Sequence, residues 1–159
     1  MRTAEEELRV AKIKNGTVID HIRAGRALQV LRILGIRGDE GHTMAVLMNV
    51  PSRKLGKKDL VKIEDRAVQP SQAQLISLVA PEASLNIISD YEVKEKYKPQ
   101  PPEKVEGLVR CPNPRCISNK PEEPIVPKLS VESKDPVMLR CVYCRAVLLG
   151  DEISTHLVE

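Results

Sequence analysis

The sequence of 159 residues contains no Phe, no Trp and only three Tyr. A hydrophobic core must therefore be built from aliphatic side chains. A small domain with such a core commonly needs a metal ion or a partner surface for its stability. The scarcity of rings also argues against binding to single-stranded nucleic acid, because proteins with that function stack bases on aromatic side chains.

Other features that mark common protein classes are also missing. No apolar run approaches the roughly 20 residues that span a bilayer, so no membrane association is expected. The first residues, MRTAEEEL, are too acidic for a secretion signal, which predicts a cytoplasmic protein whose cysteines stay thiols or bind metal. The sequence has no recognisable nucleophile–base pair, Walker loop or dinucleotide-binding glycine motif, so we expect no enzymatic activity.

Composition and charge change at the proline-rich segment 98–103, KPQPPE, which predicts a linker between two domains. Residues 1–102 carry 17 Lys and Arg against 13 Asp and Glu, whereas residues 103–159 carry 8 against 9. The first domain is therefore suited to attract a small polyanion. The second is slightly acidic, which disfavours nucleic acid as its partner.

The first domain, 1–102, alternates strand and helix patterns. Asn15-Gly16 predicts a turn between strands at 9–13 and 17–22. Apolar spacing predicts helices at 24–34 and 71–79, the second opened by a capping box at Ser71-Gln-Ala-Gln74. The remaining strand patterns lie at 43–50, 59–64, 83–89 and 92–97. This β-α-β-β-α-β order with a small extra strand predicts an α+β, ferredoxin-like domain.

The second domain, 103–159, shows only short strand patterns, at 107–110, 125–132, 137–140 and 147–149, so it is predicted to be all-β. It holds all four cysteines as two close pairs, Cys111 with Cys116 and Cys141 with Cys144. Four thiolates in two such pairs complete a tetrahedral zinc site with no position open for water, which predicts one structural zinc ion per chain. Two disulfides, a redox pair and a rubredoxin-type iron centre are the alternatives.

Several motifs resemble those of the regulatory chain of aspartate carbamoyltransferase, in the same order and spacing over almost the whole chain. They are GTVIDHI at 16–22, NVPS at 49–52, GKKDLVKIE at 56–64, Ala80-Pro81, NIISDYEV at 86–93, and the two cysteine motifs CPNPRCIS at 111–118 and CVYC at 141–144.

The resemblance implies a non-catalytic allosteric subunit in pyrimidine biosynthesis. In that family the first domain binds the nucleotides CTP and ATP, with UTP as a further effector that acts with CTP. The zinc domain docks on the separate catalytic chain. Regulatory chains pair as homodimers, and six of them assemble with six catalytic chains.

The resemblance also carries nucleotide-binding roles over to particular residues. Asp20 would accept hydrogen bonds from ribose hydroxyls, and Lys62 and Lys96 would contact ribose and phosphates. Lys12 stands where a small residue is usual in the family. The full set implied is Val10, Lys12, Ile13, Val18, Asp20, His21, Lys62, Asn86, Ile88, Tyr91, Val93 and Lys96.

Without the resemblance these residues are open to other interpretations. Lys62 and Lys96 fit solvated strand charges equally well, and Asp20 fits a turn cap. Lys57-Lys58 fits a solvated turn or a pair of charges that attracts phosphates. A zinc-ribbon protein that binds nucleic acid is the competing function, because paired cysteine motifs are common in that class.

Overall fold

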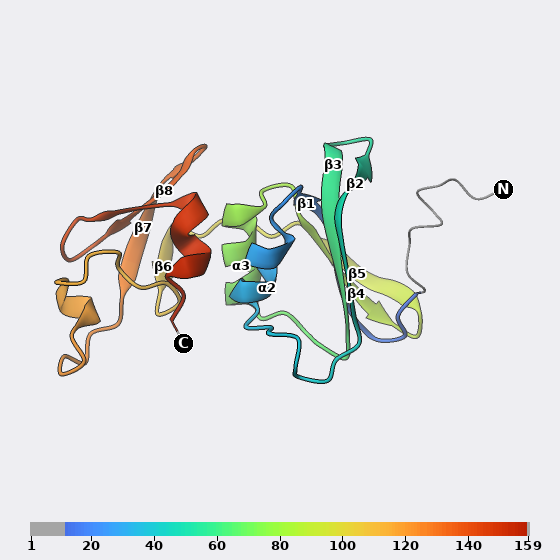
Figure 1. The fold of residues 1–159 in the computed structure, drawn as a ribbon, viewed down its shortest axis with the longest axis horizontal. Coiled ribbons are helices and arrows are strands. Elements are labelled where there is room, and N and C mark those ends of the chain that lie inside the picture. Colours follow the sequence, from blue (N-terminus) through green and yellow to red (C-terminus); the bar gives the residue numbers. More distant parts are fainter. Residues whose placement is uncertain (1–11, 159) are drawn as a thin grey trace. The chain divides into compact units, whose positions relative to one another are not determined.

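The computed structural model describes residues 12–158 of the chain (Figure 1). It divides into two compact units, one ending at Gln100 and the other beginning at Pro101. Val10 and most of the strand predicted at 9–13 lie outside the described residues. Lys12 and Ile13, the described end of that segment, are not part of a strand.

The first unit is a five-stranded antiparallel sheet with two helices on one face (Figure 1). Along the chain its elements are β1 (Gly16–Arg23), α2 (Ala27–Ile33), β2 (Met44–Ser52), β3 (Gly56–Glu64), α3 (Pro70–Val79), β4 (Ser84–Ser89) and β5 (Glu92–Tyr97). The strand order is β2-β3-β1-β4-β5. The first four strands in this order have ferredoxin-like topology, and β5 extends the sheet beside β4. The predicted fold class is confirmed.

Strand alternation separates the core from an open face of the sheet. In β3, Asp59, Val61 and Ile63 are fully buried, while Lys58, Leu60 and Lys62, which alternate with them, are only half-buried. Because successive side chains of a strand point to opposite faces, the half-buried set lies on the face away from the helices. That face carries the site described below.

The starts of both helices differ from the sequence prediction: α2 begins later, and α3 has a different N-cap residue. Helix α2 starts at Ala27 rather than at residue 24, because the carboxylate of Asp59 accepts hydrogen bonds from the backbone N–H groups of Gly25 and Ala27. In α3 the cap is Gln69, whose N–H donates to the side chain of Gln72. The predicted cap at Ser71 is wrong, since Pro70 already has the backbone φ of a first helical residue.

The second unit is a four-stranded antiparallel sheet in the order β6-β7-β8-β9. Its strands are β6 (Lys104–Glu106), β7 (Lys128–Lys134), β8 (Val137–Cys141) and β9 (Val147–Leu149), and its 3-10 helices are η1 (Ile117–Asn119) and η2 (Gly150–Thr155). The strand predicted at 107–110 is absent: the chain there makes a single bridge between Val109 and Leu157. Leu129, Leu139 and Ile153 form the centre of an aliphatic core.

Candidate functional site

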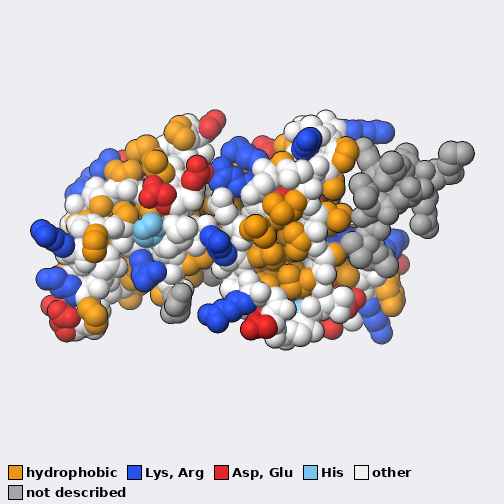
Figure 2. Space-filling view, in the orientation of Figure 1, with side chains coloured by type: hydrophobic (Ala, Val, Ile, Leu, Met, Phe, Trp, Pro, Cys, Tyr) orange, Lys and Arg blue, Asp and Glu red, His pale blue; other side chains and the backbone are white. Residues whose placement is uncertain are grey.

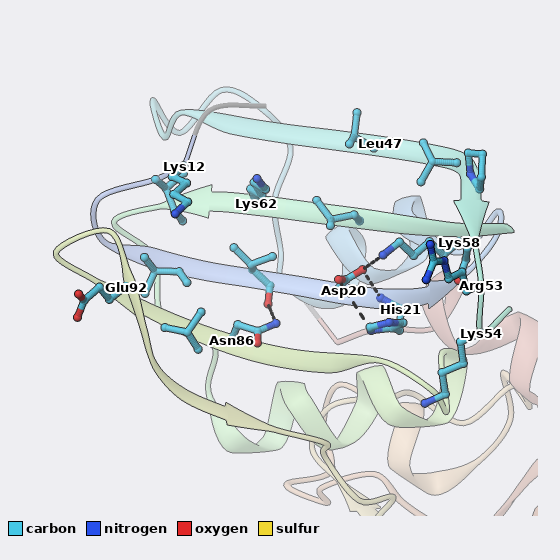
Figure 3. Close-up of a pocket in the computed structure, with 18 of the residues that line it drawn as sticks. Lys12, Asp20, His21, Leu47, Arg53, Lys54, Lys58, Lys62, Asn86 and Glu92 are labelled. Atoms are coloured by element: carbon cyan, nitrogen blue, oxygen red, sulfur yellow. Dashed lines mark hydrogen bonds and ion pairs between the residues drawn. The ribbon is translucent and has the colours of Figure 1, made fainter. Parts of the chain in front are cut away.

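A pocket of about 800 Å³ lies on the helix-free face of the first sheet (Figure 3). It lies over β1, β3 and β4 and is flanked by β2 and the β4–β5 turn. Its lining consists of Lys12, Ile13, Val18, Asp20, His21, Leu47, Val50, Pro51, Ser52, Arg53, Lys54, Lys58, Leu60, Lys62, Asn86, Ile88, Tyr91, Glu92 and Val93.

A β-bulge in β1 brings two polar neighbours to the pocket. The register of β1 against β3 shifts between Ile19 and Ile22, and His21 has a positive φ of 56°. The extra residue interrupts the alternation, so Asp20 and His21 both line the pocket while Ile19 and Ile22 are both fully buried. The ring Nδ1 atom of His21 also lies 3.4 Å from the hydroxyl oxygen of Ser84.

Asp20 is held in its charged form by its neighbours. The Nζ atom of Lys58 lies 2.9 Å from one of its oxygens, and the backbone N–H of His21 donates to the same oxygen at 2.7 Å (Figure 3). Burial raises the pKa of Asp20, but these hydrogen bonds and the nearby positive charges outweigh burial, so the pKa is lower than the ordinary value of 3.8. The carboxylate is therefore an acceptor at neutral pH.

Asp59, on the opposite face of β3, fixes the backbone around the pocket. Its side chain is fully buried, and one oxygen accepts from Gly25 and Ala27 while the other accepts from Asn49 at 2.8 Å. Asn49 is the bulge residue of β2, with a φ of 59°. One carboxylate thus joins the segment after β1 to β2, and β2 carries the lining residues Leu47, Val50, Pro51 and Ser52.

The two ends of the pocket differ chemically. Ile13, Val18, Ile88, Tyr91 and Val93 provide an apolar end, and Tyr91 is placed there by a positive φ of 66° in the tight β4–β5 turn. The cations Lys12, Arg53, Lys54, Lys58 and Lys62 outnumber the two lining carboxylates, Asp20 and Glu92. Figure 3 shows Arg53, Lys54 and Lys58 with His21 at one end, and Lys12 with Glu92 at the other. An amphipathic anion fits this arrangement.

Ten of the twelve residues predicted for nucleotide binding line this one pocket: Lys12, Ile13, Val18, Asp20, His21, Lys62, Asn86, Ile88, Tyr91 and Val93. Val10 lies outside the described residues. Lys96 is exposed and not in the lining, but it pairs with Asn86 in the β4–β5 register, which puts both side chains on the same face of the sheet.

The sequence prediction missed several lining residues. Leu47, Val50, Pro51, Ser52, Arg53, Lys54, Lys58, Leu60 and Glu92 belong to this group. Lys58 is not a solvated turn residue, since only 17% of its side chain is exposed and it pairs with Asp20. Its position in β3, four residues before Lys62 on the same face, is the signal that points to it.

The four cysteines of the second unit come together as one cluster. The Sγ atoms of Cys111 and Cys144 lie 3.4 Å apart, those of Cys116 and Cys141 lie 3.7 Å apart, and all four are within 4.8 Å of one another. Sulfur ligands about 2.3 Å from a tetrahedral metal lie roughly 3.8 Å apart, so the cluster fits one metal ion. These distances far exceed a disulfide bond, which excludes the two-disulfide alternative in this structure.

Hydrogen bonds hold the first cysteine pair in place. The Nδ2 atom of Asn119 donates to the carbonyl oxygens of Cys111 and Asn113, at 2.9 and 2.7 Å. The N–H of Asn113 points to the sulfur of Cys111 at 3.4 Å, and the Ser118 hydroxyl lies 3.2 Å from the sulfur of Cys116. Such donors orient thiolate ligands and favour their charged form.

The thiols differ in acidity. Burial raises the pKa of Cys111 far above its ordinary value and also raises the pKa of Cys141. Burial acts in the same direction on Cys144, but the backbone N–H of Ala146 and neighbouring donors outweigh it and lower the pKa of Cys144 to about 7. Cys144 is therefore more readily available as a thiolate for a metal than Cys111 or Cys141.

The fold and the two sites define a class: a binding protein with a ligand pocket in an α+β domain and a metal centre in a small β domain. Within residues 12–158, no helix has the length and apolar character needed to cross a bilayer. A family model described as the aspartate carbamoyltransferase regulatory chain, allosteric domain, matches residues 8–100, and one for the metal binding domain of the same chain matches residues 103–154. The chain belongs to the aspartate carbamoyltransferase regulatory chain family, whose members are non-catalytic subunits.

Curated relatives support this assignment over nearly the full length. The aspartate carbamoyltransferase regulatory chain of Thermofilum pendens is 53% identical over 155 residues, which cover 98% of each chain. The regulatory chain of Methanothrix thermoacetophila is 58% identical over 88% of this chain and 90% of its own. That of Saccharolobus solfataricus is 52% identical over 96% of each.

Proposed function

We propose that the first domain binds the nucleoside triphosphates CTP and ATP, and UTP together with CTP, and that binding changes the activity of the catalytic chain. The observation that supports this proposal is the order of side chains in one pocket: apolar side chains lie toward the end of Lys12 and Glu92, then comes Asp20 with Lys58, and then Arg53 and Lys54. A base, a ribose and a polyphosphate follow one another in the same order.

Each part of a nucleotide has a partner of suitable chemistry. Tyr91 and Ile88 offer apolar surface to a base. Asp20, charged at neutral pH, accepts hydrogen bonds from ribose hydroxyls, and its pairing with Lys58 fixes its orientation. Lys62 lies on the same strand face as Lys58 and supplies a second cation near the sugar and phosphates.

Regulation requires that the two quaternary states of the assembly bind the effector unequally, because equal affinity shifts no equilibrium. A coupling free energy of about 1–3 kcal/mol is typical of allosteric effectors. The metal-binding domain is the proposed contact with the catalytic chain. The metal in the four-cysteine cluster is proposed to be one structural zinc ion that holds the docking surface in shape, since all four ligands are thiolates and no ligand position remains for water.

The proposed assembly has regulatory homodimers and six chains of each kind, in the cytoplasm. An apolar surface on the first unit supports the dimer. Figure 2 shows hydrophobic side chains gathered beside α2, and Leu28 on that helix is 56% exposed. Replacement of Leu28 by Glu should turn the dimer into a monomer in analytical ultracentrifugation. An unchanged sedimentation coefficient would place the dimer interface elsewhere.

Calorimetric titration of CTP and ATP into the purified chain, with and without the catalytic chain, tests the proposed function, together with the activity of the assembly. We expect saturable binding that weakens about tenfold in Asp20→Asn, because the amide is uncharged and keeps only one of the two oxygens that can accept from ribose hydroxyls. Asp39→Asn, an exposed position outside the pocket lining, is the matched control and should bind as the wild type does. Absence of binding for every nucleotide, or an activity of the assembly that no nucleotide changes, would contradict the proposal.

A further inference from the structure

The turn between β2 and β3 contributes two adjacent cations to the pocket. Arg53 and Lys54 both belong to the lining, and both lie at the end that also holds His21 and Lys58 (Figure 3). The turn is ordered by its own side chain, since the hydroxyl of Ser52 accepts a hydrogen bond from the N–H of Leu55 at 3.1 Å. These two cations are therefore presented by a defined turn rather than by an irregular loop.

The charges of this end are not balanced by carboxylates of the pocket. Asp20 pairs with Lys58 at 2.9 Å and so compensates one cation. Within residues 12–158 the guanidinium of Arg53 has no carboxylate partner. Glu92, the second acidic lining residue, lies at the opposite end of the pocket (Figure 3). An anion bound beside the turn would supply the missing negative charge.

Lys54 has an exchangeable partner outside the pocket lining. Its Nζ atom lies 3.4 Å from an oxygen of Glu82, and the Nζ atom of Lys98 lies 3.2 Å from the same oxygen. Hydrogen bonds from Lys98 and Lys54 lower the pKa of Glu82, so its carboxylate stays charged at neutral pH. Exposed pairs of this kind are weak, and a phosphate with more charge can displace one. Glu82 keeps Lys98 as a counter-ion when Lys54 leaves.

We propose that the β2–β3 turn is a terminal-phosphate clamp, in which Arg53 and Lys54 bind the outermost phosphate of a nucleotide and Lys54 exchanges Glu82 for it. This inference rests on the proposed nucleotide function and makes it more specific: the pocket selects ligands by the number of phosphates. A triphosphate offers these two cations a terminal phosphate beyond its α-phosphate, which a monophosphate lacks. A triphosphate gains both cations.

The test is a calorimetric comparison of CTP, CDP and CMP on the full-length, metal-loaded chain in magnesium-free buffer of fixed ionic strength. The wild type should bind CTP more tightly than CDP and CMP. Arg53→Gln and Lys54→Gln should each weaken CTP binding about tenfold, as expected for the loss of a hydrogen bond to a charged group, and leave CMP binding within twofold. Lys57→Gln is the matched control, because Lys57 is exposed beside the same turn but does not line the pocket.

The outcomes separate the clamp from the function on which it rests. If the wild type binds CTP but both turn variants keep the wild-type ratio of CTP affinity to CMP affinity, the clamp is refuted and the nucleotide pocket stands. If no nucleotide binds the wild type, the proposed function itself fails, and the clamp fails with it. Loss of CMP and CTP affinity in equal proportion would also refute the clamp, because the turn would then act on the whole pocket. Circular dichroism of each variant confirms that the fold is kept.

Discussion

The carboxylate of Asp59 and the backbone N–H of Asn49 are joined by a hydrogen bond of 2.8 Å between neighbouring strands. The other oxygen of Asp59 accepts from Gly25 and Ala27 at the start of α2. Because the Asp59 side chain is fully buried, water cannot take its place as the acceptor for these three N–H groups. One buried acceptor therefore ties β2, which lines the pocket, to the segment between β1 and α2.

Asp59→Asn should lower the free energy of unfolding of the first domain by about 2 kcal/mol, because the amide group offers a donor where a second acceptor is needed. Chemical denaturation of the full chain, followed by circular dichroism, measures this change. Asp65→Asn, at a turn after β3, is the control and should change stability by less than about 0.5 kcal/mol. Equal stability of both variants would show that the three donors find other partners.

The ion pair of Asp20 with Lys58 predicts a specific pH dependence. The pKa of Asp20 is lower in the folded chain than its ordinary value of 3.8, so the charged carboxylate stabilises the fold at pH values above 3.8. This contribution is lost as the pH falls through the folded-state pKa. Lys58→Gln removes the main partner and leaves burial, which raises the pKa.

Carboxyl-detected NMR titration can follow Asp20 directly. We expect a midpoint below 3.8 in the wild type and a higher midpoint in Lys58→Gln. Lys57→Gln, the neighbouring exposed lysine, should leave the midpoint unchanged. A midpoint that does not move in Lys58→Gln would mean that the backbone N–H of His21 alone sets the acidity of Asp20.

Metal removal should affect the two domains differently. Structural zinc contributes roughly 10 kcal/mol or more to the folding of small domains, so a chelator or Cys141→Ser should unfold residues 101–159 and leave the first unit folded. Because protons compete with the metal for the thiolates, the metal should also be released as the pH falls. Two-dimensional NMR spectra with metal analysis measure both effects.

Val142→Ala is the control for the metal site, because Val142 lies between Cys141 and Cys144 and offers no ligand. It should keep one metal ion per chain. If Cys141→Ser protein retains a dispersed spectrum for the second domain without metal, the cluster is dispensable for folding. Binding of the catalytic chain should then be measured separately.

The fold class and the metal cluster could be predicted from sequence because both depend on local patterns. Alternation and helical spacing show in the order of apolar residues, and two close cysteine pairs carry their ligand chemistry in the residue type. The ten lining residues that were predicted came from the family resemblance, and their role in nucleotide binding stays a prediction. The bulge at His21 explains why Asp20 and His21 share one face, which simple alternation does not allow.

The rest of the pocket depends on contacts between distant segments, which local patterns do not contain. Arg53 and Lys54 look like ordinary turn residues in the sequence, and only the register of β2 against β3 places them beside His21. In the sequence Lys58 resembles an exposed lysine, and its ion pair with Asp20 at 2.9 Å shows only in the structure. The start of α2 likewise depends on Asp59, which is more than 30 residues distant in sequence.

Glu82 offers the last test, because it competes with the ligand for Lys54. Glu82→Gln removes the competing charge and should tighten CTP binding about threefold, within the range expected for an exposed ion pair of about 0.2–1 kcal/mol, while CMP binding stays the same. The gain should shrink at high salt, since the exposed pair is already screened there. Glu95→Gln on β5 removes an exposed carboxylate that does not line the pocket, and calorimetry should find CTP affinity unchanged. If both variants tighten CTP binding equally, the effect is that of net charge alone, and Glu82 has no special relation to the turn.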